Sequence, residues 1–211
     1  MNKFLKGMFE RYPMLSENED SIKISYDLIK TSFENKGTLF TCGNGGSASD
    51  GEHIVGELLK GFLKKRPLED NIKKIFINEF GESGVEIGQK LQGGLKAISL
   101  NSHPAFGSAF LNDVDGKFIY AQQLYALGSA GDVFLGISCS GNAQNVFNAI
   151  MVAKVKGIKT ILLTGAGGGK CCEIADCIIA VPSRETFIIQ EYHLPIYHTL
   201  CMMLEDYFYE R

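Results

Sequence analysis

The stretch TLFTCGNGGSASD, residues 38–50, places a short apolar run directly before three closely spaced glycines and two serines. An apolar run of this length predicts a buried strand. The glycines permit a sharp turn and a close approach of the backbone to a ligand, and the serines add hydroxyls beside the free N–H groups of a following helix. The stretch therefore predicts a strand, an anion-binding loop and a helix in succession, which is the repeating unit of an α/β protein.

The helix expected after this loop carries His53 and Glu57. Residues four apart lie on the same face of a helix, so these two side chains can reach a common atom. An imidazole and a carboxylate placed in this way are suited to proton transfer or to binding a metal ion. One short segment thus joins a candidate phosphate site to a candidate centre of chemistry.

Short apolar runs alternate with helical patterns along the rest of the chain, as in parallel sheets that are covered on both faces. We predict strands at 38–42, 96–100, 132–137, 159–164 and 177–181, and helices at 19–33, 49–63, 116–127, 143–156 and 186–208. The alternation predicts an α/β fold, a single doubly wound three-layer domain over residues 1–211 with a central five-stranded parallel sheet. Residues 1–35 are its N-terminal helical segment. Ligands of such sheets bind at the carboxyl ends of the strands.

Residues 67–95 interrupt the alternation. The segment is charged, contains five glycines and predicts two short helices at 71–80 and 85–91. We interpret it as an elaborated connection within the sheet and not as a separate domain.

The composition is that of a globular protein, with 211 residues, 45% of them hydrophobic, and a net charge of −3. This charge does not favour nucleic acid as a partner. The basic run at 64–66 is expected to be a solvated turn. No run of 18 apolar residues and no signal peptide is visible, so we expect no membrane association and a cytoplasmic enzyme. The six cysteines lack a Cys-x-x-Cys spacing, which favours reduced thiols over a zinc ribbon or disulfides.

A second loop of the same design follows the strand predicted at 132–137. It reads Ser138-Cys139-Ser140-Gly141-Asn142 and precedes another helix. One such loop is weak support, because serine and glycine are also common turn and cap residues. Two of them at corresponding strand ends favour a phosphorylated ligand. Neither loop is a P-loop or a dinucleotide fingerprint, so we expect a sugar phosphate and no nucleotide cofactor.

Near the C-terminus, Gln190, His193 and His198 occur within nine residues of an otherwise apolar helical pattern. A lone histidine on such a pattern is more often a core residue than a catalyst. Three of the four histidines fall in the two candidate segments, which favours a functional role. Pro195 is expected to bend the helix and to influence how the polar side chains point.

With these motifs in view, most of the chain resembles the sugar isomerase (SIS) domain family, and within it the phosphoheptose isomerases, which interconvert sedoheptulose 7-phosphate and a heptose 7-phosphate. The resemblance is carried by residues 42–47 with Asp50, His53 and Glu57, by Asn112-Asp113, by residues 136–142 and 163–165, and by Gln190, Glu191, His193 and His198.

The resemblance implies that Glu57 and His198 are the acid/base pair of a ketose–aldose isomerase working through an enediol or enediolate. It implies that one zinc ion can be bound by His53, Glu57, Gln190 and His198. It further implies a homotetramer with sites at subunit interfaces. The substrate pocket that it implies is lined by Asn44, Gly45, Gly46, Ser47, Asn112, Asp113, Ser138, Cys139, Ser140 and Gln190.

The chain departs from the family pattern at three places. Residues 67–95 are longer than the usual connection and follow directly on the helix of Glu57. Cys139 stands where the family has threonine, and Ala143 stands where it has serine, so two hydroxyls are missing. The segment 101–106 also differs. These departures leave open an SIS enzyme for a different sugar phosphate, or a non-catalytic SIS protein that binds a sugar phosphate or a protein partner.

Overall fold

A computed structural model describes residues 2–209; residues 1, 210 and 211 of the predicted domain lie outside the described part. At its centre is a sheet of five parallel strands in the order β2-β1-β3-β4-β5, with a switch point between β1 and β3. The strands are β1 (Leu39–Cys42), β2 (Ala97–Ser99), β3 (Val133–Ile137), β4 (Lys159–Gly165) and β5 (Cys177–Val181). The prediction of an α/β fold with a five-stranded parallel sheet is confirmed.

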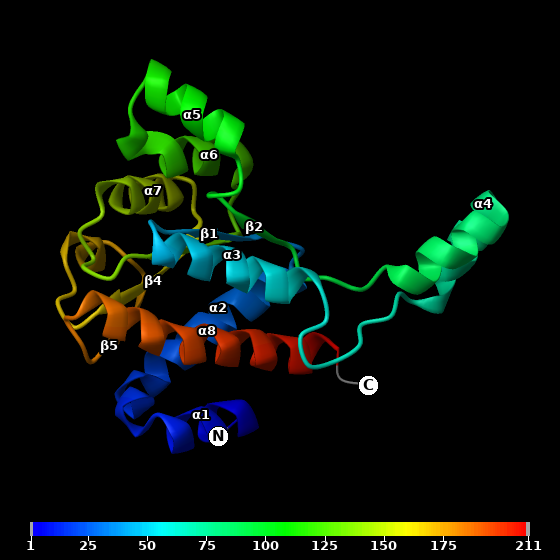
Figure 1. The fold of residues 1–211 in the computed structure, drawn as a ribbon, viewed down its shortest axis with the longest axis horizontal. Coiled ribbons are helices and arrows are strands. Elements are labelled where there is room, and N and C mark those ends of the chain that lie inside the picture. Colours follow the sequence, from blue (N-terminus) through cyan, green and yellow to red (C-terminus); the bar gives the residue numbers. More distant parts are fainter. Residues whose placement is uncertain (1, 210–211) are drawn as a thin grey trace.

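Helices cover both faces of the sheet (Figure 1). Successive side chains of a strand point to opposite faces, so Leu135 of β3 joins one buried cluster and the adjacent Phe134 joins the other. This arrangement explains why the strands read as unbroken apolar runs. The first cluster is covered by α2 (Glu19–Glu34), α3 (Gly46–Leu59) and α8 (Thr186–Phe208). Helix α1 (Lys3–Arg11) packs against α8. The second cluster is covered by α6 (Ile119–Leu127) and α7 (Gln144–Val155).

Helix α5 (Pro104–Asp113) was not predicted from the sequence. The helix is short, and Pro104 and Gly107 are residues common in turns, although Phe106 and Phe110 lie four apart and their rings stack. It packs beside α6 at the edge of the molecule (Figure 1).

Helix α3 is displaced from its predicted range of 49–63. It begins at Gly46, after Gly45 turns the chain with a φ of 56°, and it ends at Leu59. The N–H groups of Phe62, Leu63 and Lys64, which a longer helix would use internally, donate to the carboxylate of Glu205 on α8. A tertiary contact therefore ends the helix one turn early.

The basic run at 64–66 is not a solvated turn throughout, and the expectation is wrong for Arg66. The residue is 1% exposed, and its side chain pairs with Glu205, with 2.9 Å between Nε and Oε1. Lys64 forms an ion pair with Asp206, and Lys65 is exposed.

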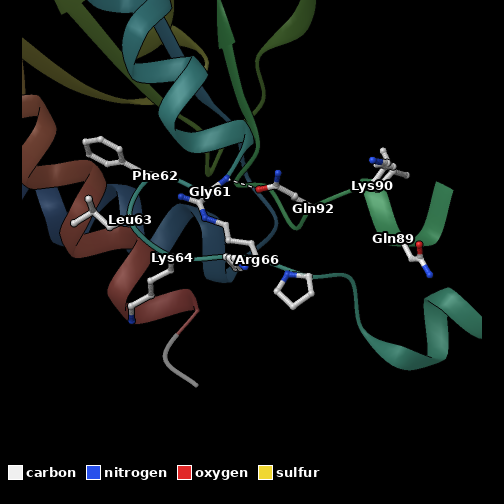
Figure 2. A pocket seen from close by; sticks show the side chains of 11 residues that line it. Gly61, Phe62, Leu63, Lys64, Arg66, Gln89, Lys90 and Gln92 are labelled. Atoms are coloured by element: carbon white, nitrogen blue, oxygen red, sulfur yellow. Dashed lines mark hydrogen bonds between the residues drawn. The ribbon is translucent and has the colours of Figure 1, made fainter. Parts of the chain in front are cut away.

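Residues 67–95 form an arm that projects from the body of the protein (Figure 1). Helix α4 (Asp70–Lys90) is broken at Gly81, whose φ is 58°, into two halves. A Cβ on Gly84 would lie 1.9 Å from the carbonyl oxygen of Phe76, so the two halves pack closely against each other there. At the neck of the arm, Gly93 N–H donates to the carbonyl of Arg66 at 2.7 Å, and Figure 2 shows Arg66 pointing back towards the body.

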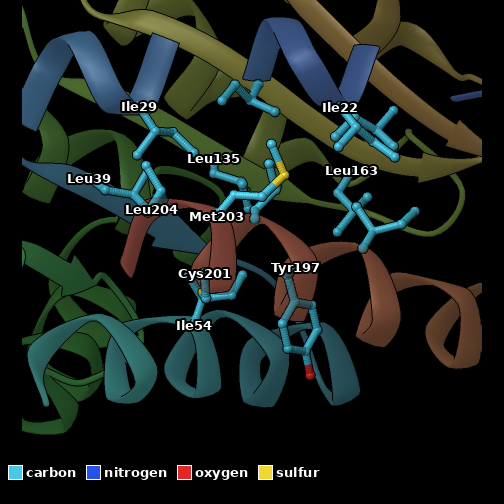
Figure 3. Packing of buried hydrophobic residues seen from close by; sticks show 14 of the residues in the cluster. Ile22, Ile29, Leu39, Ile54, Leu135, Leu163, Tyr197, Cys201, Met203 and Leu204 are labelled. Atoms are coloured by element: carbon cyan, nitrogen blue, oxygen red, sulfur yellow. The ribbon is translucent and has the colours of Figure 1, made fainter. Parts of the chain in front are cut away.

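The larger buried cluster lies between the sheet and α2, α3 and α8. Figure 3 shows α8 between α2 and α3, with Leu204 directed towards α2 and Cys201 towards Ile54 of α3. This packing fixes the position of α8 relative to α3. Within residues 2–209, no helix has both the length and the hydropathy needed to cross a membrane.

His193 of α8 belongs to this core and not to the candidate site. Its side chain is fully buried, Nε2 lies 3.3 Å from the carbonyl oxygen of Thr164, and Nδ1 has no partner. Burial lowers the pKa of His193 to about 4. The imidazole is therefore neutral in the folded protein at neutral pH.

This burial predicts an acid-sensitive contribution of His193 to stability. As the pH falls from 6.5 towards 4, the unfolded chain binds a proton at this residue and the folded chain does not, so the free energy of unfolding falls by about 3 kcal/mol. We expect His193→Gln to lose this part of the pH dependence. Urea denaturation of both proteins between pH 7.5 and 4.5 measures the free energy of unfolding at each pH. The same decrease with falling pH in both proteins would contradict the prediction.

Candidate active site

Two loops meet at the carboxyl ends of β1 and β3. Cys42, the last residue of β1, is paired with Gly136 of β3, so the loops that follow these adjacent strands leave the sheet side by side. Ser47 Oγ at the start of α3 lies 3.6 Å from Cys139 Sγ in the second loop. Ser138, also in this loop, is buried. The structure thus brings together the two loops that the sequence singled out as anion sites.

The backbone of the first loop is held by polar side chains that the sequence reading missed. Asn101 accepts a hydrogen bond from Gly43 N–H at 3.2 Å and donates to the Gly43 carbonyl at 3.0 Å. Asn44 exchanges side-chain hydrogen bonds with Asn145 of α7. The Tyr120 hydroxyl of α6 donates to the Gly43 carbonyl at 2.5 Å and lies 3.1 Å from Asn44 Oδ1. These partners follow β2 or lie on the far helical layer, where no sequence spacing connects them to residues 43–44.

The acid/base candidates from α3 and α8 form one cluster. His53 Nε2 lies 3.2 Å from Glu57 Oε1 and 3.5 Å from His198 Nε2. Lys60 Nζ lies 3.3 Å from the other carboxylate oxygen of Glu57. Burial and the neighbouring His53 lower the pKa of His198 below the ordinary value for histidine. The structure therefore brings both implied acid/base groups to the same ring nitrogen of His53.

Hydrogen bonds from Asp50 through Tyr197 fix which ring nitrogen of His53 carries a proton. The Tyr197 hydroxyl donates to Asp50 Oδ1 at 3.2 Å and lies 3.2 Å from His53 Nδ1. Burial raises the pKa of Tyr197 well above its ordinary value, so this hydroxyl stays protonated. Because its proton goes to Asp50, it accepts the Nδ1 proton, and Nε2 is the ring nitrogen that faces Glu57 and His198. Tyr197, whose ring points from α8 towards α3 (Figure 3), is a site residue that the sequence reading missed.

Gln190 of α8 packs against the start of α3. A Cβ added to Gly46 would lie 2.6 Å from Gln190 Nε2, so the amide of Gln190 rests directly on the backbone at the start of α3. Gly45, with its positive φ, turns the chain immediately before this contact.

Three of the expected pocket residues stand apart from the cluster. Asn112 and Asp113 lie at the end of α5, are exposed and are hydrogen-bonded to each other. Ser140 is also exposed, and its Oγ accepts from the N–H of Asn142. Within one chain, Asn112 and Asp113 lie on the exposed C-terminal end of α5.

The donor set of the cluster suits zinc, which binds imidazole nitrogen and carboxylate oxygen. Ligand atoms about 2.0–2.1 Å from a tetrahedral zinc ion are about 3.3 Å apart, and the spacings of His53 from Glu57 and His198 match this edge length. Within residues 2–209, however, no three His, Cys, Asp or Glu side chains already surround a common point. The residues fit the ion in type, and the two distances from His53 Nε2 are compatible with shared coordination.

Comparison with known proteins gives a consistent result. The family model of the SIS domain matches residues 5–83 and 89–165. The chain is 38% identical over 194 residues to the phosphoheptose isomerase of Thermodesulfovibrio yellowstonii, with 92% of this chain and 84% of the relative covered. It is 36% identical to that of Helicobacter pylori strain P12, with 92% and 88% covered.

Solved structures agree with the fold. The phosphoheptose isomerase GmhA of Neisseria gonorrhoeae superposes with a TM-score of 0.75 at 26% identity, with 95% of this chain and 94% of that one covered. The phosphoheptose isomerase of Francisella tularensis gives a TM-score of 0.75 at 25% identity, with 97% and 96% covered. The chain belongs to the SIS domain family and, within it, to the phosphoheptose isomerases.

The contact between Gly46 and Gln190 predicts a sharp effect of one methyl group. We expect Gly46→Ala to displace the amide of Gln190 and to lower kcat/KM about tenfold or more, although alanine is the better helix former. Steady-state kinetics of the variant measure this loss.

Gly56→Ala, ten residues along the same helix, is the matched control. A Cβ there meets nothing within 4 Å, so activity should be unchanged and stability slightly increased. Equal activity of the two variants would contradict the proposed contact.

Proposed function

We propose that this chain interconverts sedoheptulose 7-phosphate and a heptose 7-phosphate by proton transfer through an enediol or enediolate. The chain is a phosphosugar isomerase by its membership of the phosphoheptose isomerases. The proposed substrate and mechanism rest on the cluster of Glu57, His53 and His198. His53 and Glu57 lie on α3, the helix that follows the first of the two loops at the carboxyl ends of β1 and β3.

In the proposed reaction, Glu57 and His198 share the proton transfers. The Glu57 carboxylate removes the proton from C1 of the ketose, and the electron pair forms the C1–C2 double bond of the enediolate. His198 passes a proton from O1 to O2, which makes O1 the carbonyl oxygen of the aldose when the proton held by Glu57 returns to C2. Groups of these two kinds typically supply 10²–10⁴-fold in such steps.

The phosphate is assigned to the two loops. The N-termini of α3 and α7 point their free N–H groups towards this edge of the sheet, and Ser47, Ser138 and Ser140 add hydroxyls. Cys139 replaces a hydroxyl with a thiol. Residues 44–46 are proposed to bind the substrate through the backbone and the Asn44 amide, and Asn112 and Asp113 to contact it from α5.

We also propose one zinc ion per subunit, held by His53, Glu57, Gln190 and His198. When bound, the ion would polarise the substrate carbonyl and stabilise negative charge on the enediolate oxygens. The spacings within the cluster support this assignment, as do the hydrogen bonds from Asp50 through Tyr197 that place the His53 proton on Nδ1 and leave Nε2 facing the cluster.

A different sugar phosphate is the second candidate for the substrate. The arm of residues 67–95 follows directly on the helix of Glu57, and Cys139 and Ala143 remove two hydroxyls from the second loop. A non-catalytic role is less well supported, because both acid/base side chains are present.

Homotetramer assembly with sites at subunit interfaces, and location in the cytoplasm, stay predictions. Assembly is supported by large apolar side chains that are exposed on α4 and α5, among them Ile75, Phe80 and Leu111. Exposed apolar groups gathered on projecting elements are typical of interaction surfaces.

The function is tested by turnover of sedoheptulose 7-phosphate, with a panel of other ketose phosphates beside it. We expect the parent protein to form heptose phosphate and both Glu57→Gln and His198→Ala to lower kcat by 10²-fold or more. Binding of sedoheptulose 7-phosphate without turnover of any sugar phosphate would contradict the isomerase proposal. Turnover of another ketose phosphate alone would establish the second candidate.

Zinc binding is tested by metal analysis after dialysis against a chelator and reloading. We expect about one zinc per subunit and a loss of affinity of 10-fold or more in His53→Gln, because that imidazole lies between the other two donors. His103→Gln, at an exposed imidazole outside the cluster, is the control. Equal zinc content in the two variants would contradict the assignment.

A further inference from the structure

Arg66 and Glu205 form an ion pair that is fully enclosed by the protein. Each residue is 1% exposed, and Nε of Arg66 lies 2.9 Å from Oε1 of Glu205. The ring of Tyr209 lies 4.8 Å from the guanidinium carbon. The hydrogen bonds that Glu205 accepts, together with Arg66, lower the pKa of its carboxyl below the ordinary value. A buried pair of this kind is expensive to desolvate, and an apolar pair of similar size is often as stable. Stability alone does not account for it.

The arginine end of the pair holds the helix that carries Glu57. Arg66 Nη1 donates to the carbonyl oxygen of Leu58 at 2.7 Å, and Nη2 donates to the carbonyl oxygen of Glu57 itself at 3.1 Å. These are among the last carbonyls of α3, which lack partners within the helix. The guanidinium therefore fixes the last turn of α3 and, with it, the backbone from which the Glu57 side chain projects.

The glutamate end holds the residue that packs on His198. Its carboxylate accepts the N–H groups of Phe62, Leu63 and Lys64 at 2.8–3.1 Å. The ring centroid of Phe62 lies 5.4 Å from that of His198. His198 precedes Glu205 on α8 by about two helical turns. Figure 2 shows Phe62 and Arg66 at opposite ends of this loop. One carboxylate thus sets the path of the loop that faces the imidazole.

We propose that the Arg66–Glu205 pair is a positioning unit for the acid/base pair, which sets the relative placement of Glu57 and His198. The inference rests on the proposed roles of Glu57 and His198. Neither Arg66 nor Glu205 is placed to touch the substrate. The unit acts through the backbone of Glu57 on one side and the ring of Phe62 on the other. A catalytic group misplaced by about 1 Å can lower a rate by 10²-fold.

The first test is Arg66→Lys. The lysine keeps the charge opposite Glu205, but a single ammonium lacks the planar fork that reaches both α3 carbonyls and Glu205 together. We expect kcat for the sugar phosphate to fall 10- to 100-fold while KM changes less than threefold. A loss of folded protein would also lower the activity. We therefore calculate kcat per folded enzyme, with the folded fraction taken from near-UV circular dichroism and the thermal midpoint.

Asp206→Asn is the matched control. Asp206 is the next residue of α8 and pairs with Lys64 and Lys3, but none of its described contacts is to α3. We expect kcat to stay within twofold of the parent value.

A second variant keeps the test decisive if Arg66→Lys does not fold. Arg66→Met combined with Glu205→Gln removes both charges and retains an amide oxygen for the loop N–H groups. We expect a folded protein with the same loss of kcat. A folded variant of either kind with the parent kcat would overturn the inference, provided that Glu57→Gln is inactive. If Glu57→Gln is itself active, the proposed function fails instead.

Discussion

The carboxylate of Glu205 accepts four hydrogen bonds, three from the backbone of residues 62–64 and one from Arg66. A charge buried at this depth must be paired, or its desolvation would oppose folding. The chain between α3 and the arm is therefore held to one path. That path ends α3 at Leu59, begins the neck of the arm, and determines how the helix of Glu57 meets the helix of His198.

The sheet and the pair of helices α3 and α8 contribute different groups to the candidate site. The parallel strands β1 and β3 bring two glycine- and serine-containing loops to the same edge, where free N–H groups of α3 and α7 can receive an anion. The contact between α3 and α8 supplies the ionisable side chains. Gln190 of α8 touches the start of α3 at Gly46, so α8 contacts both the first loop and the helix of His53 and Glu57.

Several features could be read from the sequence because they depend on near neighbours in the chain. The strands were predicted closely, since each is a short apolar run between turn residues. His53 and Glu57 were placed on one face by their spacing alone. Helix α5 was missed, because the segment is short and contains Pro104 and Gly107, which are common in turns. Burial of Arg66 was missed, because its partner Glu205 is 139 residues away.

The sequence by itself determined the succession of the strands, the two glycine- and serine-containing loops that follow β1 and β3, and the types of side chain available for proton transfer, because each depends on local periodicity and composition. Only the tertiary structure decided that Tyr197 would orient His53, that Arg66 would be buried against α3, and that Asn112 and Asp113 would lie apart on α5. The first two outcomes depend on α8, whose Tyr197 and Glu205 are more than 100 residues from their partners His53 and Arg66. The third depends on where α5 lies, at the edge of the molecule beside α6. The physical reason is that burial and pairing are properties of the assembled fold, which no single segment carries.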